Sequence, residues 1–112
     1  MESSLVVEPL LEIFDGDRQA VAELLDEAAG FIDAAVAELA PALAARDGDV
    51  VRAKAHAIKG CAANVGAQPL SRLAATIERA ARDAQLETTD ATIGALRAAV
   101  ATFKTDVAAF KA

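Results

Sequence analysis

The chain has 112 residues, of which 54% are hydrophobic and 4% aromatic, which suits one domain with one core. Alanine supplies about half of the apolar content and favours closely packed helices over a β-sheet. A net charge of −6 argues against nucleic-acid binding, which calls for a basic face. A single cysteine, the lack of a signal peptide and the lack of a long apolar run predict a cytoplasmic protein without a membrane segment.

The first predicted helix is short and covers about residues 5–14. Pro9 is well suited to its start, because proline at the first helical position loses no hydrogen bond. Leu10, Ile13 and Phe14 are predicted to form its apolar side.

The second predicted helix is long and runs from about residue 18 to residue 45. The motif DGD at 15–17 ends the first helix, and Asp17 can cap the second. Apolar residues in the second helix recur in steps of four and three, which is the spacing of one helix face. Pro41 interrupts the pattern, and we expect either a kink there or a break followed by one last turn.

Three further helices follow after short connections. Asp49 is the predicted N-cap of the third helix, and Gly66 is its predicted left-handed terminus. Pro69 opens the fourth helix, and the segment 86–90 connects it to the fifth. The predicted inner faces are Val51, Ala55, Ile58, Ala62 and Val65 in the third helix, Leu70, Leu73, Ile77, Ala80 and Ala84 in the fourth, and Ile93, Leu96, Val100, Phe103, Val107 and Phe110 in the fifth.

Together these elements predict an all-α fold. Four amphipathic helices of similar length joined by short turns form an antiparallel up-down four-helix bundle. The short extra helix at the N-terminus would cover one end of it. Residues 1–112 are therefore expected to be a single domain without linkers or repeats.

The only histidine, His56, is predicted to face outward from the third helix. At about 100° per residue, it lies roughly 140° from the middle of the apolar face, and Gly60 lies roughly 180° from it. Lys59 is one turn after the histidine, on the flank of the helix. A solvated surface histidine is the ordinary interpretation, but it explains neither the glycine, which costs about 1 kcal/mol in a helix, nor the small residues around the ring. Gly60 would instead let the backbone of another protein approach the imidazole.

This stretch resembles the signature of histidine-containing phosphotransfer (HPt) domains, which are four-helix bundles that relay phosphoryl groups in two-component signalling. The similarity extends over nearly the whole chain. A free-standing, single-domain member is expected, because no kinase domain follows before Ala112. It rests on His56, Ile58, Lys59, Gly60, Cys61, Ala62 and Val65-Gly66, and on the segments FDGD, ALAARDGDVVRAKAH and LSRLAATIERAARD.

The resemblance implies a role for each matching residue. His56 would be phosphorylated on Nε2, Lys59 would offset the charge of the phosphoryl group, and Gly60 would admit the partner. Glu78 stands where the family often has a Gln or Glu that holds the other ring nitrogen, and by the angular count it could flank the histidine. Arg82 would either support the phosphoryl site or be a solvated arginine.

The resemblance also implies partners and a mode of action. The chain would be a phosphocarrier rather than a kinase, since it has no nucleotide-binding loop, and it would need no cofactor of its own. Its partners would be response-regulator receiver domains and a hybrid sensor histidine kinase, with Mg²⁺ supplied by the receiver domain. A monomer is expected, without nucleic-acid or membrane binding.

Four other interpretations are open at the level of the sequence. The chain could be a helical adaptor or homodimerising bundle in which His56 has no chemistry, or an inhibitor that binds receivers and is never phosphorylated. It could also be the amino-terminal module of a chemotaxis-type kinase. A hydrolase is the least favoured, because no second nucleophile or base is evident near the histidine. Cys61 is expected to be a small packing residue, since it has no partner cysteine.

Overall fold

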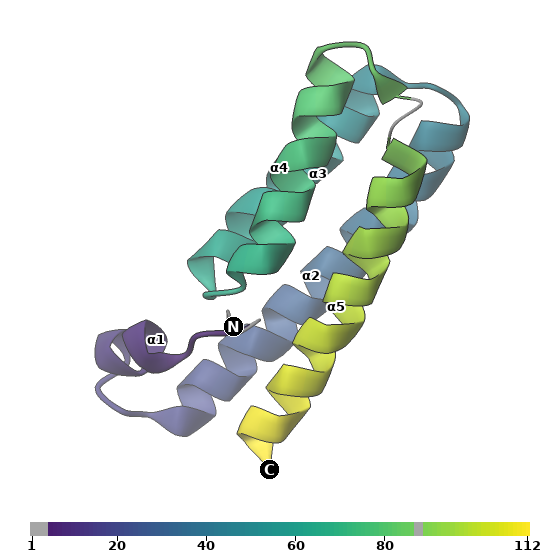
Figure 1. The fold of residues 1–112 in the computed structure, drawn as a ribbon. Helices are drawn as coiled ribbons and strands as arrows, with labels where there is room; N and C mark the ends of the chain where they lie inside the picture. The colour runs from purple at the N-terminus through teal and green to yellow at the C-terminus, as the bar shows by residue number, and fades with distance from the viewer. Residues whose placement is uncertain (1–4, 87–88) are drawn as a thin grey trace.

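The computed structural model describes residues 5–86 and 89–112, and these form an antiparallel up-down helical bundle, as predicted (Figure 1). α2 packs against α3 and α5, and α4 packs against the same two helices, so that the four long helices close around one core. α1 lies beside the start of α2. No helix of the described residues is both long and apolar enough to cross a membrane. The helices are α1 (Glu8–Ile13), α2 (Arg18–Ala44), α3 (Gly48–Asn64), α4 (Gln68–Arg82) and α5 (Thr89–Lys111).

The core consists largely of the residues whose spacing predicted it. Val21, Leu25 and Ile32 of α2 are fully buried, and the predicted faces of α3 and α5 are likewise buried apart from Phe110, which is half-buried. Two predictions of inward-facing residues were wrong. Ile13 is 72% exposed, because α1 contacts the bundle through Leu10. Ala84 lies beyond the end of α4 with a positive φ of 58°, so it does not continue the helical face.

Aspartate side chains cap the starts of α2 and α3. The carboxylate of Asp17 accepts a hydrogen bond from the backbone N–H of Ala20 at 3.1 Å, as predicted for the start of α2. The prediction of Asp49 as the cap of α3 was wrong. Asp47 has this role, accepting from the N–H of Val50 at 3.3 Å, and Asp49 lies inside the first turn. Its negative charge there favours the helix through the helix dipole.

Pro41 does not break α2. The helix continues through it to Ala44, as one element. A proline removes one backbone hydrogen bond, but only the last turn of the helix follows it here. Ala42 and Leu43 in that turn are buried in the core, and their packing holds the turn in helical geometry.

Gly66 ends α3 in the left-handed conformation that was predicted for it, with φ at +82°. Its carbonyl accepts a hydrogen bond from the N–H of Val6 at 3.1 Å, which ties the N-terminal segment to the α3–α4 connection. A Cβ at this position would overlap the carbonyl oxygen of Val6. The site therefore needs glycine for both its backbone angle and its close approach.

We expect the substitution Gly66→Ala to lower the free energy of unfolding by about 2 kcal/mol or more, because it adds a strained φ and a backbone overlap. Urea denaturation measures this change. Gly94→Ala is the control, because a Cβ at Gly94 meets nothing within 4 Å. The control should stabilise the protein by up to about 1 kcal/mol. Equal stability of Gly66→Ala and wild type would contradict the assignment of Gly66.

Candidate functional site

His56 lies on the outer side of α3, as its angle on the helix predicts. Its side chain is 68% exposed, whereas Ala55 and Ile58 beside it in the sequence are fully buried. The imidazole is therefore presented to solvent by a helix whose opposite face is held in the core. This placement rests on a rigid element rather than on a loop, so the ring has a fixed position.

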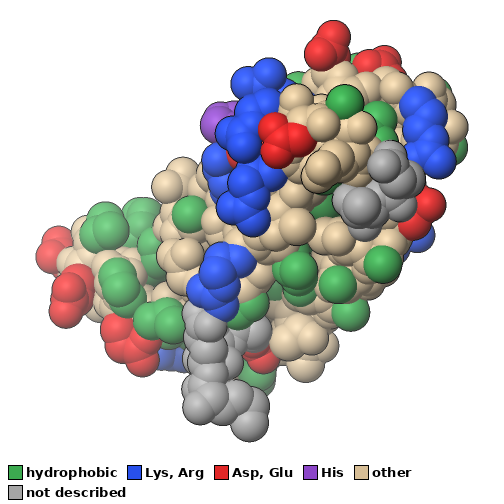
Figure 2. All heavy atoms as spheres, turned by 45° about the horizontal axis from the view of Figure 1, so that its top comes forward, with side chains coloured by type: hydrophobic (Ala, Val, Ile, Leu, Met, Phe, Trp, Pro, Cys, Tyr) green, Lys and Arg blue, Asp and Glu red, His purple; other side chains and the backbone are tan. Residues whose placement is uncertain are grey.

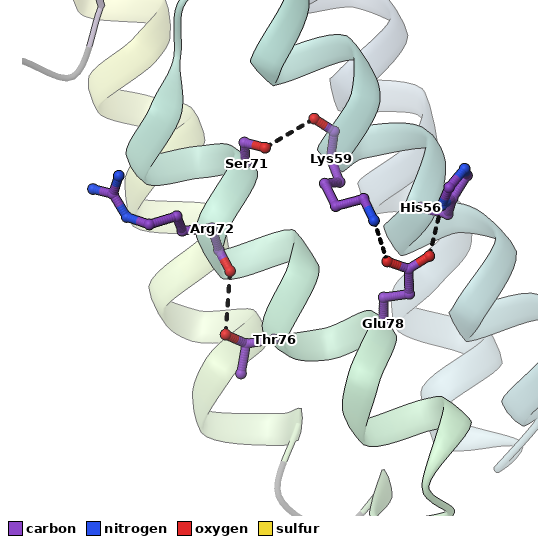
Figure 3. A network of polar contacts seen from close by, with 6 residues as sticks. All are labelled: His56, Lys59, Ser71, Arg72, Thr76 and Glu78. Atoms are coloured by element: carbon purple, nitrogen blue, oxygen red, sulfur yellow. Dashed lines mark hydrogen bonds and ion pairs between the residues drawn. The ribbon is translucent and has the colours of Figure 1, made fainter.

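Glu78 of α4 holds one nitrogen of this ring. Its Oε2 lies 2.6 Å from Nδ1 of His56, and its Oε1 accepts a hydrogen bond from Nζ of Lys59, also at 2.6 Å (Figure 3). The carboxylate thus bridges two side chains of α3, one with each oxygen. Glu78 is 18% exposed and Lys59 is 35% exposed, so the bridge is more sheltered than the imidazole itself.

The charges of this cluster determine which ring nitrogen carries a proton. The hydrogen bond from Lys59 is the largest influence on Glu78 and lowers the pKa of its carboxyl below the ordinary value. Partial burial opposes this change, and the hydrogen bond with His56 adds to it. An ionised carboxylate can only accept, so Nδ1 of His56 must be the donor. Neutral His56 then has its lone pair on Nε2, which points away from Glu78 (Figure 3).

A buried serine sets the alignment of α3 against α4. Ser71 is the buried polar side chain of the described core, 7% exposed, and its hydroxyl donates a hydrogen bond to the carbonyl oxygen of Lys59 at 3.0 Å (Figure 3). Glu78 follows Ser71 by about two helical turns on the same helix, and its carboxylate reaches both His56 and Lys59. Ser71 was not predicted as a site residue, and its position among the apolar residues of α4 was the available signal.

Gly60 leaves an open space one turn after His56. A Cβ built at this position meets no neighbouring atom within 4 Å, and the residue is exposed. The isolated protein would therefore accept a side chain there, and packing within the bundle does not explain the glycine.

An apolar groove of about 650 Å³ runs along the other side of the imidazole, between α2 and α3. Phe31 of α2 lines this groove and is 50% exposed. Phe31 was not predicted as a site residue, and its place off the buried face of α2 was the available signal. The groove is lined by Leu24, Glu27, Ala28, Phe31, His56, Ala57, Gly60, Cys61, Asn64 and Val65.

Two other residues considered at the sequence level lie near this site. Arg82 pairs with its neighbour Asp83 at 3.3 Å. Cys61 is half-buried against the core, and burial raises the pKa of its thiol. Among residues 5–86 and 89–112, no group of three or more His, Cys, Asp or Glu side chains is arranged to hold a metal ion.

The bridge formed by Glu78 predicts a particular pH dependence of stability. Because the pKa of Glu78 is lowered in the folded state, its ionised form stabilises the protein above the ordinary glutamate pKa of about 4.3. That contribution is lost as the pH falls through the lowered value. We expect wild type to melt at a higher temperature than Glu78→Gln above pH of about 5, with the difference shrinking on acidification. A difference that stays constant down to pH of about 3 would contradict the bridge.

Comparison with known proteins identifies the class. The Hpt domain family model matches residues 17–106, which is most of the chain. The chain therefore belongs to the Hpt domain family, whose members are phosphocarriers that function in histidine phosphotransfer within phosphorelays and interact with receiver domains and histidine kinases.

Among solved structures, the chain is similar to the crystal structure of histidine-containing phosphotransfer protein B (HptB) from Pseudomonas aeruginosa PAO1. The TM-score is 0.83 at 25% sequence identity, and the alignment covers 96% of both chains. No curated protein matches the sequence significantly.

Proposed function

We propose that His56 is the phosphoacceptor of a two-component phosphorelay. It would take a phosphoryl group from the aspartate of one receiver domain and pass it to another receiver domain, or back. The observation that carries this proposal is the exposed imidazole whose Nδ1 is bound by an ionised carboxylate, with Nε2 directed outward. Membership of the Hpt family supports the same reaction.

The transfer is a displacement at phosphorus. The lone pair on Nε2 of His56 attacks the phosphorus of the aspartyl phosphate, an N–P bond forms, and the P–O bond to the aspartate breaks. The electrons of that bond stay on the aspartate as its carboxylate. The ring gains a positive charge, because Nδ1 keeps its proton, and Glu78 stabilises this charge through the contact at 2.6 Å. The reverse displacement returns the phosphoryl group to an aspartate.

Lys59 and Gly60 would assist this step in different ways. Nζ of Lys59 is bound to Glu78, one turn from the ring, and we assign it the role of offsetting negative charge on the phosphoryl group. Gly60 would allow the receiver backbone to approach Nε2, since its outer side is open. Phosphoryl transfer depends mainly on positioning and charge stabilisation, and these are the two contributions proposed for Gly60 and Lys59.

The proposal includes the partners expected from the sequence. They are receiver domains of response regulators and a hybrid sensor histidine kinase, and the Mg²⁺ of the reaction is proposed to come with the receiver domain. The chain would act as a monomer with one docking face around His56.

Phosphotransfer profiling tests the proposal. Each receiver domain of the source organism is phosphorylated, incubated with the chain, and followed for transfer of label, with His56→Gln as the control. We expect at least one receiver to give acid-labile, base-stable label on wild type within seconds to minutes and none on the variant. If no receiver exchanges label with wild type faster than with the variant, the proposed function is wrong.

A further inference from the structure

The charge of this acidic protein is unevenly distributed. Of the 17 acidic and 11 basic residues, α2 holds five acidic and one basic. The two helices that form the histidine site have the opposite balance, with two acidic and six basic residues in α3 and α4 together. Figure 2 shows Lys and Arg side chains gathered beside the histidine. The site therefore has an apolar and acidic border on its α2 side and a basic border on its α4 side.

Two arginines lie one turn from the His56–Glu78 contact. Arg52 precedes the histidine by four residues on α3 and lines an open hollow of about 490 Å³ together with Asp49, Ala53 and both residues of that contact. Arg82 follows Glu78 by four residues on α4. Because α3 and α4 are antiparallel, one turn back along α3 and one turn forward along α4 reach the same level. The two arginines thus share the end of the site farthest from Gly60.

Arg52 and Arg82 differ in what they contact from three lysines that link helices of the bundle. Lys54, Lys104 and Lys111 each bind a carboxylate of α2, which links the helices of the bundle. Arg52, by contrast, has no carboxylate within 4.0 Å among the residues that the structure describes. Within the described part of the chain, Arg82 pairs with the adjacent Asp83, and both side chains of this pair are about half exposed. Their positive charges are therefore available to a partner.

We propose that Arg52 and Arg82 form a basic docking surface that receives an acidic surface of the receiver domain and accelerates its association with the chain. This inference rests on the proposed function and names the chemistry of its partner. A receiver that holds Mg²⁺ beside a phosphorylatable aspartate must present clustered carboxylates, because Mg²⁺ is bound by oxygen ligands. Arginine is well suited to carboxylates, since its planar group donates two parallel hydrogen bonds.

The basic docking surface also determines the orientation in which the receiver domain binds the chain. With basic residues along α4 and the acidic Glu27 along the groove on α2, a receiver turned by half a revolution would place like charges against each other. Charge complementarity of this kind acts mainly on the rate of association and less on the chemical step.

The experiment measures phosphotransfer from the receiver domain that reacts fastest with wild type in the profiling. The variants are Arg52→Gln, Arg82→Gln and their double variant, and Arg97→Gln is the matched control. Arg97 lies on α5 in a hollow shared with α2, away from the site, and its loss changes the net charge by the same one unit. The transfer rate of each variant is measured at receiver concentrations below and above saturation. Each measurement is made at ionic strengths of about 0.01 M and about 1 M, where the Debye lengths are roughly 30 and 3 Å.

At the low ionic strength, we expect the second-order rate constant to fall about threefold for each single variant and about tenfold for the double variant. Arg97→Gln should change it by less than about 1.5-fold, and the saturated rate should stay at the wild-type value in all of them. The differences should disappear at the high ionic strength.

Rates of Arg52→Gln and Arg82→Gln that match the Arg97→Gln control would overturn this inference while leaving the proposed function intact, because wild type would still transfer label. A loss confined to the saturated rate would also overturn it, since the arginines would then act on the chemical step. If wild type took up no label from any receiver domain, both the proposed function and this inference would be wrong.

Discussion

Replacing His56 by Gln is expected to abolish phosphorylation of this chain while leaving its fold and stability unchanged to within about 0.5 kcal/mol. The side chain is 68% exposed and its polar contact is with Glu78 alone among the described residues, so little packing is lost. A glutamine amide cannot supply the lone pair that Nε2 provides. Transfer of label from a phosphorylated receiver measures the first effect, and thermal unfolding measures the second.

The same variant separates the carrier from its rivals. A carrier with His56→Gln should still bind the receiver, since the groove and Gly60 are untouched, but signalling through it should stop. An adaptor or a non-phosphorylated inhibitor would keep its full signalling output with this substitution. Unchanged output in cells that carry His56→Gln would therefore argue for one of those two alternatives.

Gly60→Gln is expected to reduce phosphotransfer by about a hundredfold without harming the fold, because a displacement of roughly 1 Å at the reacting atoms has an effect of this size. A side chain here meets open space in the free protein and would lie between Nε2 and the approaching receiver. Glutamine is uncharged and a good helix former, so the free protein should become more stable by up to about 1 kcal/mol. Transfer kinetics and urea denaturation measure the two effects.

Gly94→Gln is the matched control for this experiment. Gly94 is also exposed within a helix, and a Cβ added to it would also meet nothing within 4 Å, but it lies on α5. Both variants should gain stability, and only Gly60→Gln should lose transfer. Equal transfer by the two variants would show that the open space at Gly60 has no part in docking.

Most of the fold was predictable because helix periodicity and turn chemistry agree along the whole sequence. Alternating steps of three and four residues identified nearly all of the core. The ends were harder to predict, because Asp47 and Asp49 flank Gly48 and both suit an N-cap. The burial of Ile13 was wrongly predicted, because α1 has only six residues and these are too few to establish which of its faces is buried.

The candidate site was predictable only as far as one helix determines it. The angle of His56 on α3 indicated its exposure, and the same geometry placed Gly60 on the outer side. Contacts between helices depend on their relative alignment, which local spacing does not encode. The distance from Glu78 to His56, the hydrogen bond of Ser71 and the place of Phe31 in the groove therefore required the assembled bundle.

Nε2 of His56 is proposed to take up the phosphoryl group, because it is accessible and because Nδ1 is already hydrogen-bonded to Glu78. Nuclear magnetic resonance of the ¹⁵N-labelled chain after reaction with a phosphorylated receiver tests it most directly, because the coupling between ³¹P and the ring nitrogens locates the new bond. We predict a single phosphoryl group on Nε2 of His56, with Nδ1 still protonated toward Glu78. A phosphoryl group on Nδ1, on another residue, or on none would contradict the account.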